Sequence, residues 1–278
     1  MRVAVLASGS SGNAILVSAD DTHLLVDAGI SARRVTRALH ALDVRPEDLR
    51  AVLVTHEHGD HVSGLGPLVR RLHVPVYATR GTLGRIRRLI KGGGAAVVVD
   101  AGSTFEVGTV NVSPFAVSHD CVDPVGYSFD DGGVRVVVAT DLGVVGRSVR
   151  DHLSRADCIV LESNHDERML LDGPYPWHLK RRILSNTGHL SNDAAAREID
   201  LLCSGRLSSL VLAHISHENN RPDLAVAAAA AILDRRGRTD VAVTAASRDE
   251  PTDPVEIAGP VGPSTDERRE EASTVCAG

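Results

Sequence analysis

The segment "VTHEHGDHVSGL" (residues 54–65) is unusually dense in side chains that bind metals. It places four of them within six positions: His56, His58, Asp60 and His61. The apolar run "RAVLVT" (50–55) just before it is typical of a buried β-strand. Polar groups gathered this densely serve no packing purpose, because burying them costs free energy unless they find partners. The pattern therefore favours a metal site over a surface loop.

Other metal-competent residues follow apolar runs in the same way. They are Asp27 after "HLLV", His119 after "FAVS", Asp141 after "VVVAT" and His214 after "LVLA". Loops at the ends of strands are held by a rigid sheet, and functional residues concentrate there. We therefore expect these side chains to converge on one rim of the molecule.

Imidazole nitrogen and carboxylate oxygen suit zinc, manganese or iron. His56 and His58 are two residues apart and point the same way in an extended loop, whereas Asp60 and His61 turn toward a second position. Four ligands are too many for one tetrahedral site with an open water position, so two metals fit better, with Asp141 as a bridge. Two neighbouring metals share a hydroxide nucleophile and hold the attacked and leaving oxygens. A zincin H-E-x-x-H motif is excluded, because position 60 is Asp.

The 278 residues suit one large α/β domain or two small ones. Hydrophobic residues make up 43% and aromatic residues only 3%, so aliphatic side chains must fill the core. Short apolar runs predict strands at 2–7, 13–18 and 23–28, and the spacing of apolar residues predicts a helix over 31–42. The second half repeats this texture without a strict repeat.

The net charge of −6 lies entirely in residues 249–278, which leaves residues 1–248 electrically balanced. This last segment is rich in Pro, Gly and acidic residues and has no apolar period, which predicts a disordered acidic tail. A solvated tail without a role is the simplest interpretation. We therefore predict one folded domain over 1–248.

Composition also bears on the compartment. No apolar run approaches the roughly 20 residues of a membrane span, and the N-terminal apolar stretch is too short for a secretory signal. The cysteines are scattered, without a C-x-x-C pair: Cys121, Cys158, Cys203 and Cys276. A disulfide framework is not expected, and the chain fits a reducing cytoplasm without a membrane partner.

The string His56-x-His58-x-Asp60-His61 resembles the signature of the metallo-β-lactamase superfamily, and the other strand-end residues match further motifs in order. The resemblance runs from residue 1 to about 245. It implies an αββα sandwich with a dinuclear metal site at one edge. It also implies the following roles: His56, His58 and His119 on one metal, Asp60, His61 and His214 on the other, Asp141 as the bridge, and Asp27 beneath as an anchor.

Longer strings are similar to the YycJ/WalJ group of bacterial metal-dependent exonucleases. They include "LASGSSGN" (6–13), "LESNHD" (161–166), "PYPWHLKRRILSNTGHLSNDAA" (174–195) and "LAHISHENN" (212–220). The resemblance implies a hydrolase that needs two divalent ions, zinc or manganese, and acts on nucleic acid as a DNA exonuclease. The resemblance does not fix the oligomeric state, and a homodimer is one of the alternatives. The sequence is also similar, more distantly, to transfer-RNA 3′-processing endonucleases. The long flexible arm with which those enzymes grip transfer RNA has no obvious counterpart in it.

Glu162 and His189 match the motifs that donate a proton in those endonucleases. The chemistry agrees, because a leaving alkoxide needs a proton and His189 is a natural donor if a carboxylate raises its pKa. The alternative is that His189 only precedes a helix that Ser191 or Asn192 caps. Cys121, two residues after His119, is interpreted as a neighbour of the site or as incidental.

Basic side chains near these motifs are candidate contacts to backbone phosphates. They are Lys180, Arg181 and Arg182, with a second group at Arg80, Arg85, Arg87, Arg88 and Lys91. A solvated charged face is an equal alternative, and His165 is either a phosphate contact or a surface residue. "SGSSGN" (8–13) fits a tight hairpin better than a phosphate cradle.

Two rival functions remain. The same metal site would serve a small-molecule phosphodiesterase or a thioester or lactone hydrolase, which needs a closed apolar pocket rather than a long basic groove. A metal-stabilised interaction module without catalysis is the other alternative. The complete ligand set argues against it, because a scaffold does not need an open bridging position.

Overall fold

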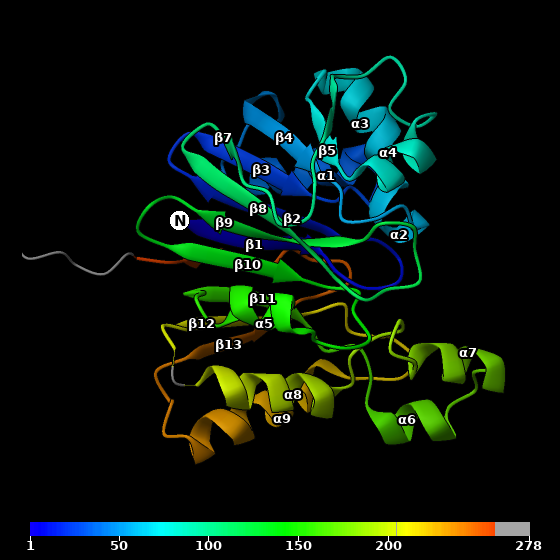
Figure 1. Ribbon diagram of the computed structural model, residues 1–278, viewed down its shortest axis with the longest axis vertical. Helices are drawn as coiled ribbons and strands as arrows, with labels where there is room; N and C mark the ends of the chain where they lie inside the picture. The colour runs from blue at the N-terminus through cyan, green and yellow to red at the C-terminus, as the bar shows by residue number, and fades with distance from the viewer. Residues whose placement is uncertain (204, 259–278) are drawn as a thin grey trace, which may run out of the picture.

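The computed structural model describes residues 1–203 and 205–258. Within them, two seven-stranded sheets pack face to face, and helices cover the outer face of each sheet (Figure 1). This arrangement confirms the predicted αββα sandwich.

The first sheet comes from the N-terminal part of the chain and one strand near its other end. Its strands in spatial order are β14 (Val255–Glu256), β1 (Arg2–Ala7), β2 (Ala14–Ala19), β3 (Thr22–Val26), β4 (Leu49–Leu53), β5 (Val76–Ala78) and β6 (Ala96–Val98). Strands β1 to β3 are antiparallel neighbours, whereas β3 to β6 run parallel. Parallel neighbours require crossover connections, which helices provide in most of this sheet.

The second sheet repeats this design. Its strands in spatial order are β13 (Ala242–Ala245), β12 (Ser209–Ala213), β11 (Cys158–Glu162), β10 (Arg135–Ala139), β9 (Val125–Asp130), β8 (Val110–Ala116) and β7 (Phe105–Val107). Strands β7 to β10 are antiparallel, and β10 to β13 are parallel. The similar texture of the two halves of the sequence therefore reflects two sheets of like topology.

The helices form the outer layers. They are α1 (Ala32–Ala41), α2 (Gly59–Val62), α3 (Leu65–Leu72), α4 (Arg80–Ile86), α5 (Arg147–Leu153), α6 (Glu167–Asp172), α7 (Trp177–Ile183), α8 (Asn192–Leu202) and α9 (Pro222–Arg235), with a 3-10 turn at Pro46–Asp48. The side chain of Ser31 caps α1 by accepting a hydrogen bond from Arg34 N. Helices α6 and α7 project from the body at the lower right of Figure 1. None of the helices in the described chain has the length and apolar content of a membrane span.

Aliphatic side chains fill the space between the layers. In β1, Val3 and Val5 belong to the core between the sheets, whereas Ala4 and Leu6 pack in the layer that contains α1 and α3. This alternation follows from the two-residue period of a strand. Tyr127 of β9 is among the largest fully buried side chains.

The folded region continues beyond the predicted boundary at residue 248. Strand β14 pairs with β1, Thr252 N donates a hydrogen bond to Val5 O (2.9 Å), and Ile257 is buried in the core between the sheets. The disorder expected for 249–278 therefore does not extend to 249–258. The rest of the predicted tail, 259–278, lies outside the described residues.

Candidate metal centre

The predicted site residues lie together at one rim of the sandwich. Strands β3, β4, β8, β10 and β12 end there, and just after them come Asp27, His56, His119, Asp141 and His214 respectively. The short helix α2, which carries Asp60 and His61, lies at this rim, on the right in Figure 1. The rim therefore gathers residues from both sheets.

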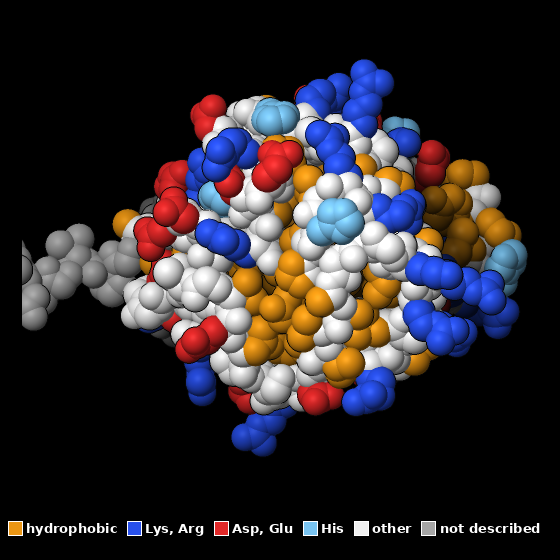
Figure 2. All heavy atoms as spheres, turned by 90° about the horizontal axis from the view of Figure 1, so that it is seen from above, with side chains coloured by type: hydrophobic (Ala, Val, Ile, Leu, Met, Phe, Trp, Pro, Cys, Tyr) orange, Lys and Arg blue, Asp and Glu red, His pale blue; other side chains and the backbone are white. Residues whose placement is uncertain are grey.

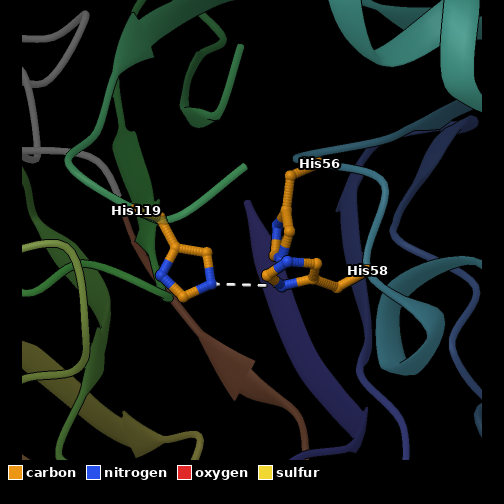
Figure 3. Close-up of side chains that lie close together, drawn as sticks. All are labelled: His56, His58 and His119. Atoms are coloured by element: carbon orange, nitrogen blue, oxygen red, sulfur yellow. Dashed lines mark hydrogen bonds between the residues drawn. The ribbon is translucent and has the colours of Figure 1, made fainter. Parts of the chain in front are cut away.

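Two groups of side chains match the two predicted ligand sets. His56, His58 and His119 have ligand atoms within 4.8 Å of one another, and their rings converge in Figure 3. Nε2 of His119 lies 3.2 Å from Nδ1 of His58. Asp60, His61 and His214 form the second group, also within 4.8 Å. Each group thus offers three donor atoms to one position.

Asp141 lies between the two groups. Its Oδ2 is 3.2 Å from His61 Nε2, and its Oδ1 is 3.4 Å from His214 Nε2 and 3.9 Å from His119 Nε2. The carboxylate is nearly inaccessible to solvent. Asp141 is therefore placed where a bridging ligand would lie.

Neighbouring polar groups hold the imidazoles in orientation. His61 Nδ1 donates to Asp27 Oδ2 (2.8 Å), and the same carboxylate accepts hydrogen bonds from Thr55 N and Thr55 Oγ1, both 2.8 Å. His119 Nδ1 donates to Gly188 O (3.1 Å). Such contacts fix which ring nitrogen faces the metal position. They leave Nε2 of both His61 and His119 pointing into the site.

Three of the site residues have a left-handed backbone. The φ angles are 60° at Asp27, 57° at Asp141 and 52° at His214. Non-glycine residues adopt this conformation rarely, and such strain often marks functional sites. Each of these residues directly follows a strand or lies one residue beyond it, so the chain bends sharply where the side chain enters the site.

The donor set fits divalent metal ions. Nε2 of His56 and Oδ2 of Asp141 are buried and form no hydrogen bond with a described residue. Buried polar atoms normally have partners, and orphans call for an ion or water. The donors are imidazole nitrogens and carboxylate oxygens only, as zinc or manganese prefer.

Burial and neighbouring charged groups shift the pKa values of His56 and His61 in opposite directions. Burial disfavours protonation of His61, but the carboxylates of Asp141 and Asp27 outweigh it and raise the pKa of His61 well above its usual value. Burial, assisted by the neighbouring His61, lowers the pKa of His56 well below its usual value. The two rings are only 4.1 Å apart between centroids. Ligation to a cation requires a neutral imidazole, and burial already favours that form for His56.

Glu162 and His189 also lie at the site. His189 Nδ1 is 2.7 Å from Glu162 Oε1, and the His189 ring is stacked 5.1 Å from that of His214. The other oxygen of Glu162 accepts hydrogen bonds from Leu142 N and Leu190 N. Burial alone would raise the pKa of Glu162, but the charge and hydrogen bond of His189 lower it to about 2. Glu162 is therefore a fixed carboxylate that orients His189.

The basic candidates have different surroundings. Lys180 is buried, and its Nζ donates to Leu171 O (2.6 Å) and Gly173 O (2.8 Å), so it stabilises the turn after α6. Arg181 and Arg182 are exposed on α7. His165 is 1% exposed and thus presents almost no surface to a substrate. Its two ring nitrogens form no hydrogen bond with a described residue.

Sequence reasoning missed an ion pair at the mouth of the site. Arg182 and Asp120 form a two-pronged hydrogen-bonded pair, one contact of which is 3.0 Å. Asp120 Oδ1 also lies 3.5 Å from His119 Nε2 and 3.9 Å from His58 Nε2. In the sequence, the only sign that Asp120 lies at the site is its position directly after His119. Asn164, whose amide donates to the carbonyl oxygen of His214 (2.9 Å), was missed as well.

The fold and the site define a class of metal-dependent hydrolases. Residues 22–215 match the Beta-lactamase superfamily domain, and the chain belongs to this superfamily. It is 36% identical over 239 residues to the exodeoxyribonuclease YycJ of Bacillus anthracis, covering 85% of this chain and 90% of that protein. It is 37% identical over 233 residues to the exodeoxyribonuclease WalJ of Streptococcus pneumoniae, covering 81% and 85%.

A solved structure agrees on the fold. The metallo-beta-lactamase fold protein YhfI from Bacillus subtilis superimposes with a TM-score of 0.70 at 20% identity, covering 90% of this chain and 98% of that one. The predicted superfamily, its YycJ/WalJ relatives and the assignment of the chain as an enzyme are thus confirmed.

Proposed function

We propose that this protein is a dinuclear metal-dependent phosphodiesterase that acts on nucleic acid as a DNA exonuclease. One observation carries the proposal: two three-ligand groups meet at the buried carboxylate of Asp141. The two exodeoxyribonuclease relatives support DNA as the substrate.

The ligand assignment follows the two groups. The first ion would be held by His56, His58 and His119. The second ion would be held by Asp60, His61 and His214. Asp141 would contact both ions. Two ions at these positions would supply Lewis-acid charge and would lower the pKa of the attacking water. Asp27 keeps Nε2 of His61 directed at the site through its 2.8 Å contact with Nδ1.

His189 would protonate the leaving oxygen. Its Nδ1 is held by Glu162, and its Nε2 forms no hydrogen bond with any residue in the described ranges. A donor of this kind contributes roughly 10²- to 10⁴-fold to the rate. Glu162 acts through His189, as a positioning residue.

The surroundings of the site favour a charged polymer over an acyl substrate. The hollow next to His214 is lined largely by serine and charged side chains rather than by an apolar wall. On the face shown in Figure 2, Asp and Glu lie mainly to the left, and the largest group of Lys and Arg lies to the right, the side of the site in Figure 1. We propose Arg181 and Arg182 as the contacts to substrate phosphate from α7, whereas Lys180 and His165 are too buried to serve in this way.

The test is nuclease activity with end-labelled polymers. Purified protein with manganese or zinc is incubated with 5′- and 3′-labelled duplex and single-stranded DNA and RNA. We expect stepwise loss of nucleotides from DNA, and no turnover with reduced bound metal for Asp60→Ala. Asp21→Ala, an exposed acid at the opposite end of β3, is the matched control.

Two outcomes would contradict the proposal. Metal-loaded protein that cleaves no polymer would exclude a nuclease, and full activity of metal-depleted Asp60→Ala protein would exclude the metal mechanism.

A further inference from the structure

A second feature, outside the metal ligands, is a hollow of about 170 Å³ that is partly open to solvent. Its wall comes from the β1–β2 turn, the loop after β12, Arg248 after β13, and Tyr175 between α6 and α7. This volume is smaller than the roughly 300–1,000 Å³ that is usual for small-molecule sites, so a larger ligand would extend through the open side. Segments far apart in the sequence thus enclose one space.

The hollow adjoins the metal centre. Ser8, which lines it, accepts a hydrogen bond from His214 N through Oγ at 2.6 Å. Ile215, which directly follows His214 in the chain, also lines the hollow. A ligand in this space therefore lies beside His214, the proposed ligand of the second metal.

One side of the hollow suits an anion. The backbone amides of Ser10 and Ser11 donate no hydrogen bond to any described residue, and both residues are exposed. Arg248 Nε donates to Ser11 Oγ (3.0 Å), which holds the guanidinium beside these amides. Gly9 and Gly12 flank the turn with φ of 124° and 150°. Successive free amides in such a turn, next to a cation, are a favourable site for phosphate oxygens.

The lining of the hollow also offers ring surfaces. Tyr175 is half-buried and His217 is exposed, and both line the hollow. Nucleic-acid bases stack on aromatic side chains with a gain of about 1–3 kcal/mol per base. Glu218, also in the wall, lies 3.3 Å from His217 and is the local acid partner. An anion side and a ring side together match a nucleotide.

We propose that this hollow binds the terminal nucleotide of the strand being cut. The inference rests on the proposed nuclease function. The phosphate to be cleaved lies at the metal centre, the nucleoside lies between Tyr175 and His217, and its outer phosphate contacts the Ser10 and Ser11 amides and Arg248. The site therefore recognises a strand end that carries a terminal phosphate.

The experiment compares DNA duplexes that differ only in a terminal phosphate or hydroxyl, at the 5′ end and at the 3′ end. At the end that is degraded, we expect a phosphate to raise kcat/KM about tenfold, because it adds charge-assisted hydrogen bonds. Arg248→Ala should remove this preference. Arg45→Ala, an exposed arginine paired with Asp48, is the control and should keep the preference.

A binding measurement separates this inference from the nuclease proposal. Calorimetry with deoxyadenosine 3′,5′-bisphosphate should show about tenfold weaker binding to Arg248→Ala than to the wild type. Equal binding, or equal rates on phosphate and hydroxyl ends of cleaved DNA, would overturn the nucleotide site and leave the nuclease intact. Weaker binding by the variant without cleavage of DNA would overturn the nuclease and support the nucleotide site.

Discussion

His189 shows how a single residue obtains a role from its neighbours. Its Nδ1 is fixed by a fully buried carboxylate, and its ring is stacked with that of His214. The competing interpretation, a histidine that merely precedes a helix, is compatible with the same local sequence. Ser191 does cap α8, by accepting a hydrogen bond from Ala194 N. His189 therefore lies before a capped helix and at the site at once.

Replacing His189 by Ala should slow cleavage of ordinary DNA by roughly 10²- to 10⁴-fold, because the leaving oxygen loses its proton donor. With a thymidine p-nitrophenyl phosphate ester, whose leaving group needs no proton, the rate of cleavage should fall much less. The measurement is kcat/KM on both substrates for the variant and for His178→Ala, an exposed histidine on α7. Equal losses on both substrates would remove His189 as the acid.

At the scale of elements, the turn after β3 is locked against α2. Gly29 N donates to Asn13 O (2.8 Å), and Asn13 N donates to Asp60 O (2.7 Å). A Cβ on Gly29 would lie 1.6 Å from Asp60 O, closer than any real contact. The β1–β2 turn, the turn after β3 and α2 therefore form one unit that positions Asp60.

Gly29→Ala should therefore destabilise the protein by about 3 kcal/mol or more, because an overpacked site relaxes only by moving backbone. It should also lower metal content, since Asp60 shifts. Gly84→Ala is the matched control: it lies in α4 with open space around its Cβ. It should be neutral or gain roughly 0.5–1 kcal/mol. Urea unfolding and metal analysis measure both effects, and a stable, metal-replete Gly29→Ala protein would contradict the locked turn.

At the scale of the whole molecule, the first sheet joins segments that are far apart in the chain. Strand β14 pairs with β1, and Met1 N donates to Ile257 O (3.0 Å). Ile257 is 4% exposed. Residues 249–258 thus complete the edge of the first sheet.

A chain ending at residue 248 should be less stable than one ending at 258 by about 3 kcal/mol. The loss combines the burial of Ile257, worth roughly 1.5–3 kcal/mol, with lost strand hydrogen bonds of about 1 kcal/mol each. Thermal unfolding of the two chains, with Ile257→Ala in the longer chain, makes the comparison. Equal stability of the two chains would show that β14 contributes nothing.

Stability should also fall with acid through His165. Burial lowers the pKa of His165 to about 4, whereas the unfolded chain protonates it near 6.5. The folded state therefore keeps this ring neutral, and the associated stability is present above pH 6.5 and is lost as the pH falls toward 4. The shift corresponds to roughly 3 kcal/mol.

Urea unfolding of the wild type and His165→Gln between pH 7 and 4.5 tests this linkage. The variant should lose less stability over that range, and His178→Gln, exposed on α7, should behave as the wild type does. Parallel curves for wild type and His165→Gln would show that His165 does not titrate in this way.

Much of the fold was predictable because its elements have local signals. The strand over 2–7 has the predicted bounds, and the helix expected over 31–42 spans Ala32–Ala41. The short edge strands β6 and β7 and the helices α4, α5 and α6 were not predicted. They are too short for a clear periodicity, and tertiary contacts stabilise them. Strand β14, hidden in an acidic, Pro-rich segment, exists because β1 offers it an edge.

The sequence by itself determined the candidate ligands at the ends of apolar runs, since the period of a strand and the spacing of "HEHGDH" are local properties of the chain. Only the tertiary structure decided how they meet. The Asp120–Arg182 pair joins residues 62 positions apart, and Ser11 and Arg248 are 237 apart. Contacts over such separations depend on how two sheets pack and where loops close, and no local pattern encodes them.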